Sequence, residues 1–352
     1  MKPNPSAIGL CSPTLAKKLD TCGYMVAFSR DQVFDGLDRP NMFSSLGSAS
    51  HALIEKAHRG FFNDVPEEEL GGAVSAQWDI AIESENALLV SAWAPSEPPL
   101  LRDWRGYQIT RSKTRKRVLK DIRRFRENPG SGGRGPVVEQ RLEDDKKELC
   151  GKPDRIEWHQ GVPVVVDVKA GLEQEGIRPD QRRQLLFYAH LVNIVHGVAP
   201  QTIVVESPSG ERWSSSVGVD EVEELVKDVE RGVQRFNDCP EGEHERLARP
   251  SKVACQYCPF RTYCKPFWAA LRVGWGQHAV SGHVRSAREE GDGQVVVIDV
   301  KSPIDWPGKK ARIPPQENLQ AGQRVSVIDA KPITVGALGV RWNTQVTVFP
   351  LK

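Results

Sequence analysis

The sequence predicts an α/β fold in which strands and helices alternate along the middle of the chain. A β-branched run at 162–169 has the composition of a buried strand, and a shorter strand is expected at 154–158. A helix around 181–191 presents an apolar stripe at helical spacing. A strand at 202–206 and a helix at 219–236 continue the alternation, which is typical of a sheet covered by helices.

The strand at 162–169 ends in charged residues. Side chains alternate between the two faces of a strand, so Asp167 and Lys169 share one face, and Asp154 can come alongside from the neighbouring strand. Burying a charged side chain costs free energy unless the charge is paired or serves a function such as metal binding. Two carboxylates and one ammonium indicate a Mg²⁺ site, which could serve phosphodiester hydrolysis. The alternative for Asp167 and Lys169 is a surface ion pair on an edge strand.

Three short motifs follow one another along the chain: G-x-x-D, D-x-K and Q-x-x-x-Y, formed by Gly151 and Asp154, Asp167 and Lys169, and Gln184 and Tyr188. In this order they resemble the RecB-like branch of the PD-(D/E)xK nuclease superfamily. The resemblance covers roughly residues 12–267. It implies a restriction-endonuclease-like fold, with a mixed sheet flanked by helices.

The resemblance also implies a metal site. His51 belongs to a G-x-x-x-H element that begins at Gly47. With Asp154 and Asp167 it is expected to ligate one or two Mg²⁺ or Mn²⁺ ions, and the Val168 carbonyl is a further expected ligand. The alternative is a helical histidine that serves packing or lies on the surface.

The remaining motif residues are expected to act beside the metal. The resemblance implies that Lys169 orients or deprotonates the attacking water and that Gln184 positions the substrate. Tyr188 is expected on a helix packed against the site, and its alternative is a half-buried core tyrosine. Glu139, on a strand expected at 137–142, is a candidate for an additional acidic residue.

A cysteine cluster follows the predicted α/β region. Cys255, Cys258 and Cys264 have C-x2-C-x5-C spacing, and thiolates bind soft metals. Closed iron–sulfur and zinc sites need four ligands, so the fourth must come from elsewhere in the chain.

The fourth ligand is expected near the N-terminus. The iron–sulfur subgroup of RecB-like nucleases, including AddB-type and CRISPR-associated members, has this spacing and one distant N-terminal cysteine, which implies a 4Fe–4S cluster. Cys22 fits that position, although Gly23 follows it where the family usually has proline. Cys11 is the rival candidate, and a zinc site completed by Cys239 or His244 is an alternative, as are unliganded thiols.

A helical insertion is expected at about 62–135. Its segment 111–126 is strongly basic and helical in pattern, and a Gly- and Pro-rich loop follows at 128–136. The net charge of the chain is only +2, so this concentration of charge favours a phosphate-contacting helix over a solvated face. The expected nucleic-acid contacts are Arg115, Lys116, Arg123 and Arg124.

The expected pattern of elements changes after a nuclease-like domain, which is expected at 1–273. Within 274–352, four short strands are expected, separated by Gly, Pro and Asp turns. This pattern resembles a small β-barrel of the OB type, common in nucleic-acid binders. A structural β appendage is the alternative. The four segments are 278–287, 294–301, 324–330 and 345–349.

Composition limits the class of protein. The chain has 352 residues, of which 39% are hydrophobic and 27% charged, as in a globular protein. No long apolar run predicts a signal peptide or a membrane span. Seven cysteines, an odd number, predict a reducing compartment and therefore a cytoplasmic protein.

The first functional hypothesis is a metal-dependent DNA nuclease acting on ends or single strands, in repair, recombination or defence. The sequence has no G-x4-G-K-[ST] phosphate loop, so any ATP-driven unwinding would need a helicase partner. The second hypothesis is a non-catalytic nucleic-acid-binding subunit of a helicase–nuclease complex. The third is a zinc-stabilised scaffold.

Overall fold

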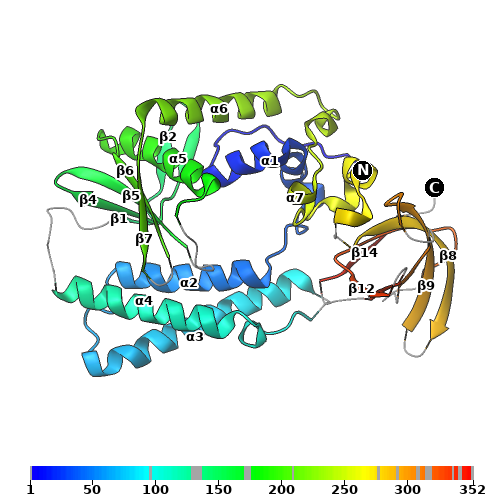
Figure 1. Ribbon diagram of the computed structural model, residues 1–352, viewed down its shortest axis with the longest axis horizontal. Helices are drawn as coiled ribbons and strands as arrows, with labels where there is room; N and C mark the ends of the chain where they lie inside the picture. Colours follow the sequence, from blue (N-terminus) through cyan, green and yellow to red (C-terminus); the bar gives the residue numbers. More distant parts are fainter. Residues whose placement is uncertain are drawn as a thin grey trace.

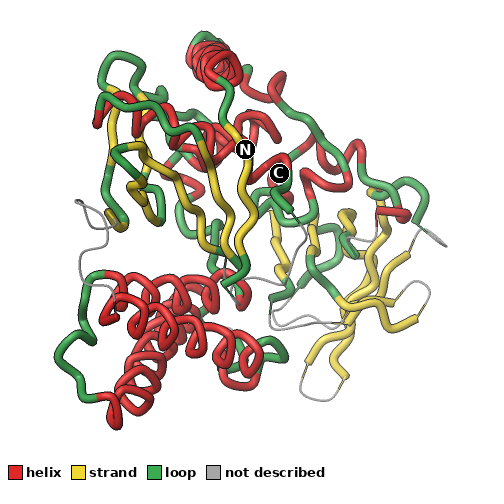
Figure 2. Tube along the Cα trace, turned by 60° about the vertical axis from the view of Figure 1, so that its left-hand side comes forward, coloured by secondary structure: helices red, strands yellow, loops and turns green. Residues whose placement is uncertain are grey.

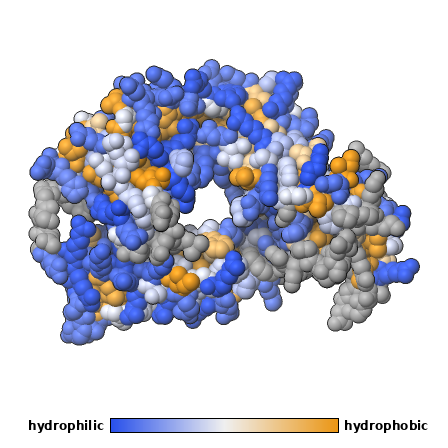
Figure 3. Space-filling view, in the orientation of Figure 1, coloured by the Kyte–Doolittle hydropathy of each residue, from blue (hydrophilic) through white to orange (hydrophobic). Residues whose placement is uncertain are grey.

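The computed structural model places an α/β unit before a second β-sheet (Figure 1). In this view an opening lies between the helices of residues 42–127 on one side and the helices α1 Pro13–Ser29 and α7 Lys252–Cys255 on the other (Figure 3). The residues that the structure describes are 2–94, 97–127, 137–169, 176–207, 210–275, 278–290, 293–306, 310–313, 319–334, 337–339 and 343–349.

The α/β unit is built on a five-stranded sheet with the order β1-β4-β5-β6-β7. β5 and β6 run parallel, whereas the other neighbours are antiparallel, so the sheet is mixed. A tight turn joins β4 to β5, with positive φ at Gln160 and Gly161. The strands are β1 Val137–Val138, β4 Arg155–His159, β5 Val162–Val168, β6 Thr202–Glu206 and β7 Arg212–Ser216.

Helices cover both faces of this sheet (Figures 1 and 2). Alternation along β5 buries Val165 against one helical layer and Val164, Val166 and Val168 against the other. The first layer contains α1 Pro13–Ser29, α5 Pro179–His196 and α6 Val219–Asn237. The second contains α2 Met42–His58, α3 Glu67–Trp93 and α4 Tyr107–Glu127. The predicted mixed sheet flanked by helices is therefore confirmed.

A short hairpin ties the first layer to the N-terminal segment. β2 Leu142–Asp144 pairs with β3 Leu149–Gly151 in a separate two-stranded sheet. Cys11 bridges to Leu149, and the Cys150 N–H donates to the Cys11 carbonyl at 2.9 Å. The single strand expected at 137–142 is thus divided between two sheets.

Helix α1 begins and bends where its sequence allows. The Ser12 side chain caps the helix, and Pro13 occupies the first turn, where its missing N–H costs nothing. Cys22 leaves the helical region with φ −168° and ψ 104°, and the helix resumes to Ser29. Cys22 therefore lies at a kink inside α1 rather than at its end.

The C-terminal residues form a seven-stranded sheet with the order β12-β13-β10-β9-β8-β11-β14. The four expected strands correspond to β8, β9, β11 and β14, and β10, β12 and β13 were not anticipated. Within the described residues the sheet is open, with β12 and β14 as its edges, so the OB-like barrel is not formed there. The strands are β8 Val280–Glu290, β9 Gly293–Ser302, β10 Lys310–Ile313, β11 Arg324–Ile328, β12 Lys331–Thr334, β13 Ala337–Gly339 and β14 Gln345–Phe349.

Two further properties concern the chain as a whole. None of the described helices is long and apolar enough to cross a membrane. All seven cysteines are free thiols, and three of them are buried.

Candidate active site and cysteine site

The acidic motif residues meet where β4 begins and β5 ends. Asp154 immediately precedes β4, and its Oδ2 accepts a hydrogen bond of 2.6 Å from the Val168 N–H. Lys169 Nζ lies 2.9 Å from Oδ1 and 2.7 Å from Oδ2 of Asp167, whose side chain is buried. The D-x-K motif therefore forms a close ion pair beside the Asp154 carboxylate.

Burial opposes the ionised form of Asp154. Burial raises its pKa to about 6, and the charge of Asp167 contributes to the rise. The His51 ring, the Val168 N–H and Lys169 oppose it. Because a divalent cation would supply the positive charge that this carboxylate lacks, the donor set fits a bound metal.

His51 and Glu139 complete a group of metal-ligand type. His51 Nδ1 lies 4.0 Å from Asp154 Oδ1. The ligand atoms of His51, Glu139 and Asp154 all lie within 4.8 Å of one another, and no other described group of three or more residues does so. Glu139 has a positive φ of 52° and pairs with Lys152 at 2.5 Å. One imidazole and two carboxylates suit Mg²⁺ or Mn²⁺.

Asp167 lies outside this group of three. The structure thus brings together two of the predicted ligands, His51 and Asp154, and adds Glu139. Asp167 is instead held by Lys169. The signal for Glu139 in the sequence was only an acidic residue on an expected strand, since its approach to Asp154 depends on the Glu139 N–H donating to the Asp154 carbonyl at 3.2 Å.

Gln184 and Tyr188 lie one turn apart on α5. Gln184 Nε2 is 3.4 Å from the Tyr188 hydroxyl, and burial raises the pKa of Tyr188 to about 12. The ring packs so closely on Gly151 that a Cβ there would lie 2.8 Å from Tyr188 Cε1. The glycine of the G-x-x-D motif is therefore required for α5 to approach the hairpin that leads to Asp154.

The basic helix α4 divides into two sets of side chains. Arg123 pairs with Glu67 at 2.7 Å, and Arg115 Nη2 donates to the Gly71 carbonyl at 3.3 Å, so both contact α3. Lys116, Lys120 and Arg124 are exposed, line one surface hollow and have no ion-pair partner among the described residues. Figure 3 shows a mostly hydrophilic surface over α3 and α4.

These three exposed cations form a stripe at intervals of four residues. Such intervals place side chains on one helix face, about 6 Å apart along the axis. The prediction from sequence named Lys116 and Arg124 but not Lys120. It also did not anticipate that Arg117 and Asp121, within the same segment, are buried.

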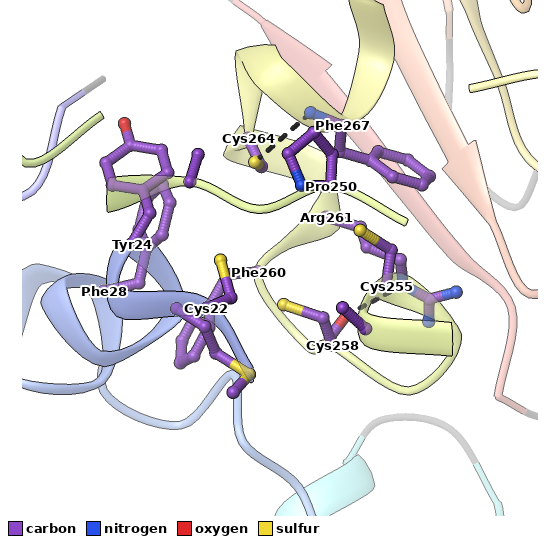
Figure 4. Close-up of a pocket in the computed structure, with 13 residues that line it drawn as sticks. Cys22, Tyr24, Phe28, Pro250, Cys255, Cys258, Phe260, Arg261, Cys264 and Phe267 are labelled. Atoms are coloured by element: carbon purple, nitrogen blue, oxygen red, sulfur yellow. Dashed lines mark hydrogen bonds between the residues drawn. The ribbon is translucent and has the colours of Figure 1, made fainter. Parts of the chain in front are cut away.

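The four cysteines expected to bind a cluster line a single pocket (Figure 4). Cys22 comes from the kink of α1, Cys255 from the short helix α7 Lys252–Cys255, and Cys258 and Cys264 from the segment that follows. Burial raises the pKa of all three thiols in the C-terminal set, that of Cys258 to about 12. Thiols in so apolar a pocket become thiolates only with a compensating metal.

The position of Cys22 depends on the glycine after it. A Cβ on Gly23 would lie 2.9 Å from Leu247 Cβ, so a larger residue would push α1 away from the segment that leads to Cys255. The Arg249 N–H donates to Cys22 Sγ at 3.5 Å and adds a second contact to this segment. The departure from proline at Gly23 is therefore compatible with the pocket.

The other candidate ligands lie elsewhere. Cys11 is buried beside the β2–β3 hairpin, and His244 packs its ring 5.0 Å from Phe236. Neither residue lines the pocket, and neither does Cys239.

The spacing of the sulfurs bears on the metal. Four thiolates around one zinc ion lie about 3.8 Å apart, because tetrahedral Zn–S bonds are about 2.3 Å long. Among the described residues, which include every cysteine, no three sulfurs lie within 4.8 Å of one another. The sulfurs are therefore farther apart in this structure than four thiolates bound to one zinc ion would be.

Comparison with protein families agrees with the fold. The model of the PD-(D/E)XK nuclease superfamily matches residues 11–265. The chain therefore belongs to this superfamily, whose members are typically metal-dependent nucleases. A search of curated proteins found no match.

Proposed function

We propose that this protein is a metal-dependent DNA nuclease that hydrolyses phosphodiester bonds. The observation that carries the proposal is the group of His51, Glu139 and Asp154, whose ligand atoms lie within 4.8 Å, next to the Asp167–Lys169 ion pair. An imidazole and three carboxylates at one sheet edge form a donor set for a hard divalent cation, and the ammonium of Lys169 lies beside them.

Each residue has a defined task in this proposal. His51, Asp154 and Asp167 hold Mg²⁺ or Mn²⁺, with Glu139 and the Val168 carbonyl as further ligands. When bound, the metal supplies a Lewis acid for the scissile phosphate and lowers the pKa of water. Lys169 balances charge near the scissile phosphate and orients the attacking water, or takes the proton of that water once it has lost its own proton to solvent.

The motif residues on α5 act around this centre. Gln184 positions the substrate, and Tyr188 fixes the distance between α5 and the hairpin through its contact with Gly151. Neither residue needs to exchange a proton for these tasks.

The substrate is DNA, in the form of ends or single strands, and the helix α4 contacts its backbone. Lys116, Lys120 and Arg124 are free to bind phosphates, whereas Arg115 and Arg123 are engaged with α3. Phosphate contacts hold the substrate in place without reading its sequence. A helicase or recombination partner would supply unwinding, as in repair, recombination or defence.

The proposal includes membership of the iron–sulfur subgroup of RecB-like nucleases, which the four cysteines around one pocket support. Cys22, Cys255, Cys258 and Cys264 hold a 4Fe–4S cluster that joins the N-terminal helix to the end of the nuclease domain, residues 1–273. The C-x2-C-x5-C spacing and the position of all four residues at one pocket support this assignment. Iron content and the brown colour of the purified protein test this part of the proposal.

A digestion assay tests the nuclease. Single-stranded and duplex DNA, each labelled at one end, are incubated with the protein and Mg²⁺, Mn²⁺ or EDTA. Cleavage that needs the metal and disappears in Asp167→Ala supports the proposal, and the labelled end shows the polarity. DNA binding without cleavage under every condition would instead favour a non-catalytic subunit of a helicase–nuclease complex.

A further inference from the structure

A chain of buried ion pairs lies on the face of the central sheet that α2 and α4 cover. Arg155 and Glu206 are the strand partners of Val166 and Val168, whose side chains pack against these helices. The side chains in the chain of ion pairs are all at most 13% exposed. Its members are His58, Asp121, Arg117, Glu206, Arg155 and Glu157.

Glu206 is the centre of this chain. Its Oε1 lies 2.7 Å from Arg117 Nη2 on α4, and its Oε2 accepts a short hydrogen bond from Arg155 Nη2 on β4. Arg155 also pairs with Glu157 at 2.8 Å, and Arg117 Nη1 donates to the Ser207 carbonyl at 3.2 Å. One carboxylate thus joins the central sheet to the helical layer.

The chain continues to the helix that carries His51. Arg117 Nε donates to Asp121 Oδ2 at 2.6 Å, and the same oxygen lies 2.9 Å from His58 Nε2. His58 and His51 are seven residues apart on α2, so they lie on the same side of the helix. The position of His51 is therefore connected to Glu206 through α2, α4 and the ion pairs.

Arg155 and Glu206 are also connected through the backbone to the other candidate ligands. Arg155 follows Asp154 directly, and Glu206 is the parallel-sheet partner of Val168. The Lys169 N–H donates to the Glu206 carbonyl at 2.9 Å. A shift of Arg155 or Glu206 would consequently move Asp154, or the Val168–Lys169 segment, away from His51.

We propose that Arg155 and Glu206 are positioning residues of the metal site, which fix Asp154 and the end of β5 relative to His51. This inference rests on the proposed metal-dependent function and adds residues that do not touch the metal or the substrate. Bound metals need their ligands held within fractions of an ångström, and partners behind the ligands commonly determine metal affinity. An arginine that bridges two carboxylates supplies this constraint because its guanidinium is planar and has fixed donors.

Two substitutions test the inference. Glu206→Gln keeps the shape of the side chain but removes the charge between Arg117 and Arg155. Arg155→Lys keeps the charge but loses the planar bridge from Glu206 to Glu157. For each variant, circular dichroism establishes folding, calorimetry measures Mn²⁺ affinity without DNA, and cleavage assays give kcat and KM.

We expect both variants to bind Mn²⁺ about 10- to 100-fold more weakly and to lose kcat by a similar factor, with the KM for DNA within about twofold of wild type. The matched control is Asp144→Asn. It breaks another buried ion pair, in which Asp144 Oδ2 lies 2.8 Å from His190 Nε2, and this pair is not connected to the ion pairs of Arg155 and Glu206. A purely structural role would lower the melting temperature in all three variants and leave Mn²⁺ affinity unchanged.

The outcomes separate this inference from the proposed function. If wild-type protein does not cleave DNA but the variants still lose Mn²⁺ affinity, the nuclease proposal fails and the positioning role stands. If wild-type protein cleaves DNA and folded Glu206→Gln and Arg155→Lys bind Mn²⁺ like wild type, the positioning role is overturned. If Glu206→Gln fails to fold, Arg155→Lys alone tests the positioning role, because this substitution preserves the buried positive charge.

Discussion

Arg261 joins the cysteine site to the C-terminal sheet. Its Nε donates to the Cys258 carbonyl at 2.7 Å, and its Nη2 lies 2.7 Å from Asp329 Oδ2, at the end of β11. Around this link, residues from both sides form one apolar cluster: Cys255, Phe267, Trp268, Leu271, Ala279 and Ile328. A division of the chain between residues 273 and 274 would therefore cut through a shared core.

The first prediction concerns a truncated chain that ends at Gly274. From the sequence, such a chain is expected to fold and keep its cysteine site. The structure changes this expectation, because truncation removes Ile328 and Asp329 and exposes Phe267 and Trp268. Exposing these two large side chains, which are buried in the full chain, lowers the free energy of unfolding by several kcal/mol, at about 1.5–3 kcal/mol each. We expect a lower melting temperature and lower iron content, measured by thermal denaturation and metal analysis. Wild-type values for both would show that the shared core is not needed.

The second prediction concerns Cys22. If it is the fourth ligand, Cys22→Ser should remove the brown colour and sharply lower the melting temperature, since ligand bonding contributes to folding free energy. Closing so long a loop adds on the order of 4–5 kcal/mol by analogy with a disulfide. Cys11→Ser, outside the pocket, should keep the iron. Iron loss in Cys11→Ser alone would transfer the ligand role to Cys11.

The third prediction concerns Lys169. Lys169→Met should reduce cleavage by about 10²–10⁴-fold, the range for loss of a group that handles a proton in the transition state. DNA affinity, measured by fluorescence anisotropy in Ca²⁺, should stay within about threefold, because phosphate contacts elsewhere position the substrate. Lys152→Met, which removes the partner of Glu139, is the control for loss of a nearby ammonium. Cleavage by Lys169→Met at the wild-type rate would contradict the assigned role.

The fourth prediction concerns the stripe on α4. Replacing Lys116, Lys120 and Arg124 with Gln should weaken binding to every single-stranded sequence and reduce the slope of log K against log salt by about 2, for three lost phosphate contacts. The control replaces Arg115 and Arg123, which contact α3, and should change the slope much less. Equal salt slopes in the two variants would show that this stripe of α4 is a solvated face rather than a phosphate-binding surface.

The fifth prediction concerns pH and Asp154. Burial raises its pKa to about 6, above the ordinary value near 4, so folding takes up a proton between about pH 4 and pH 6. The free energy of unfolding of the metal-free protein therefore contains a cost that grows as the pH rises through this interval and is complete above it. Asp154→Asn removes the cost while the amide oxygen can still accept the Val168 N–H.

In EDTA, we expect Asp154→Asn to stabilise the protein at pH 7 by on the order of 2 kcal/mol and to have little effect at pH 4. Urea denaturation at the two pH values measures both differences. The same substitution should abolish metal-dependent cleavage. A variant that is destabilised at pH 7 would contradict the view that ionised Asp154 is a cost which the metal relieves.

Local sequence patterns determined the elements and the family. The β-branched run of β5, the apolar stripe of α5 and the Ser12-Pro13 start of α1 are signals within one element, because they depend on side-chain period or capping chemistry. Asp154, Asp167 and Lys169 are likewise close in sequence, at the ends of two neighbouring strands. These features were sufficient to predict the mixed sheet flanked by helices and the nuclease superfamily.

Only the tertiary structure decided which distant residues meet. The approach of Glu139 to His51, the burial of Arg117 on a strongly basic helix and the choice of Cys22 over Cys11 in the pocket depend on contacts between elements far apart in sequence. The open C-terminal sheet is a further example, because strand order follows from pairing between strands rather than from their composition. A charged residue looks the same in sequence whether it faces solvent or a buried partner, and its neighbours across the fold make the difference.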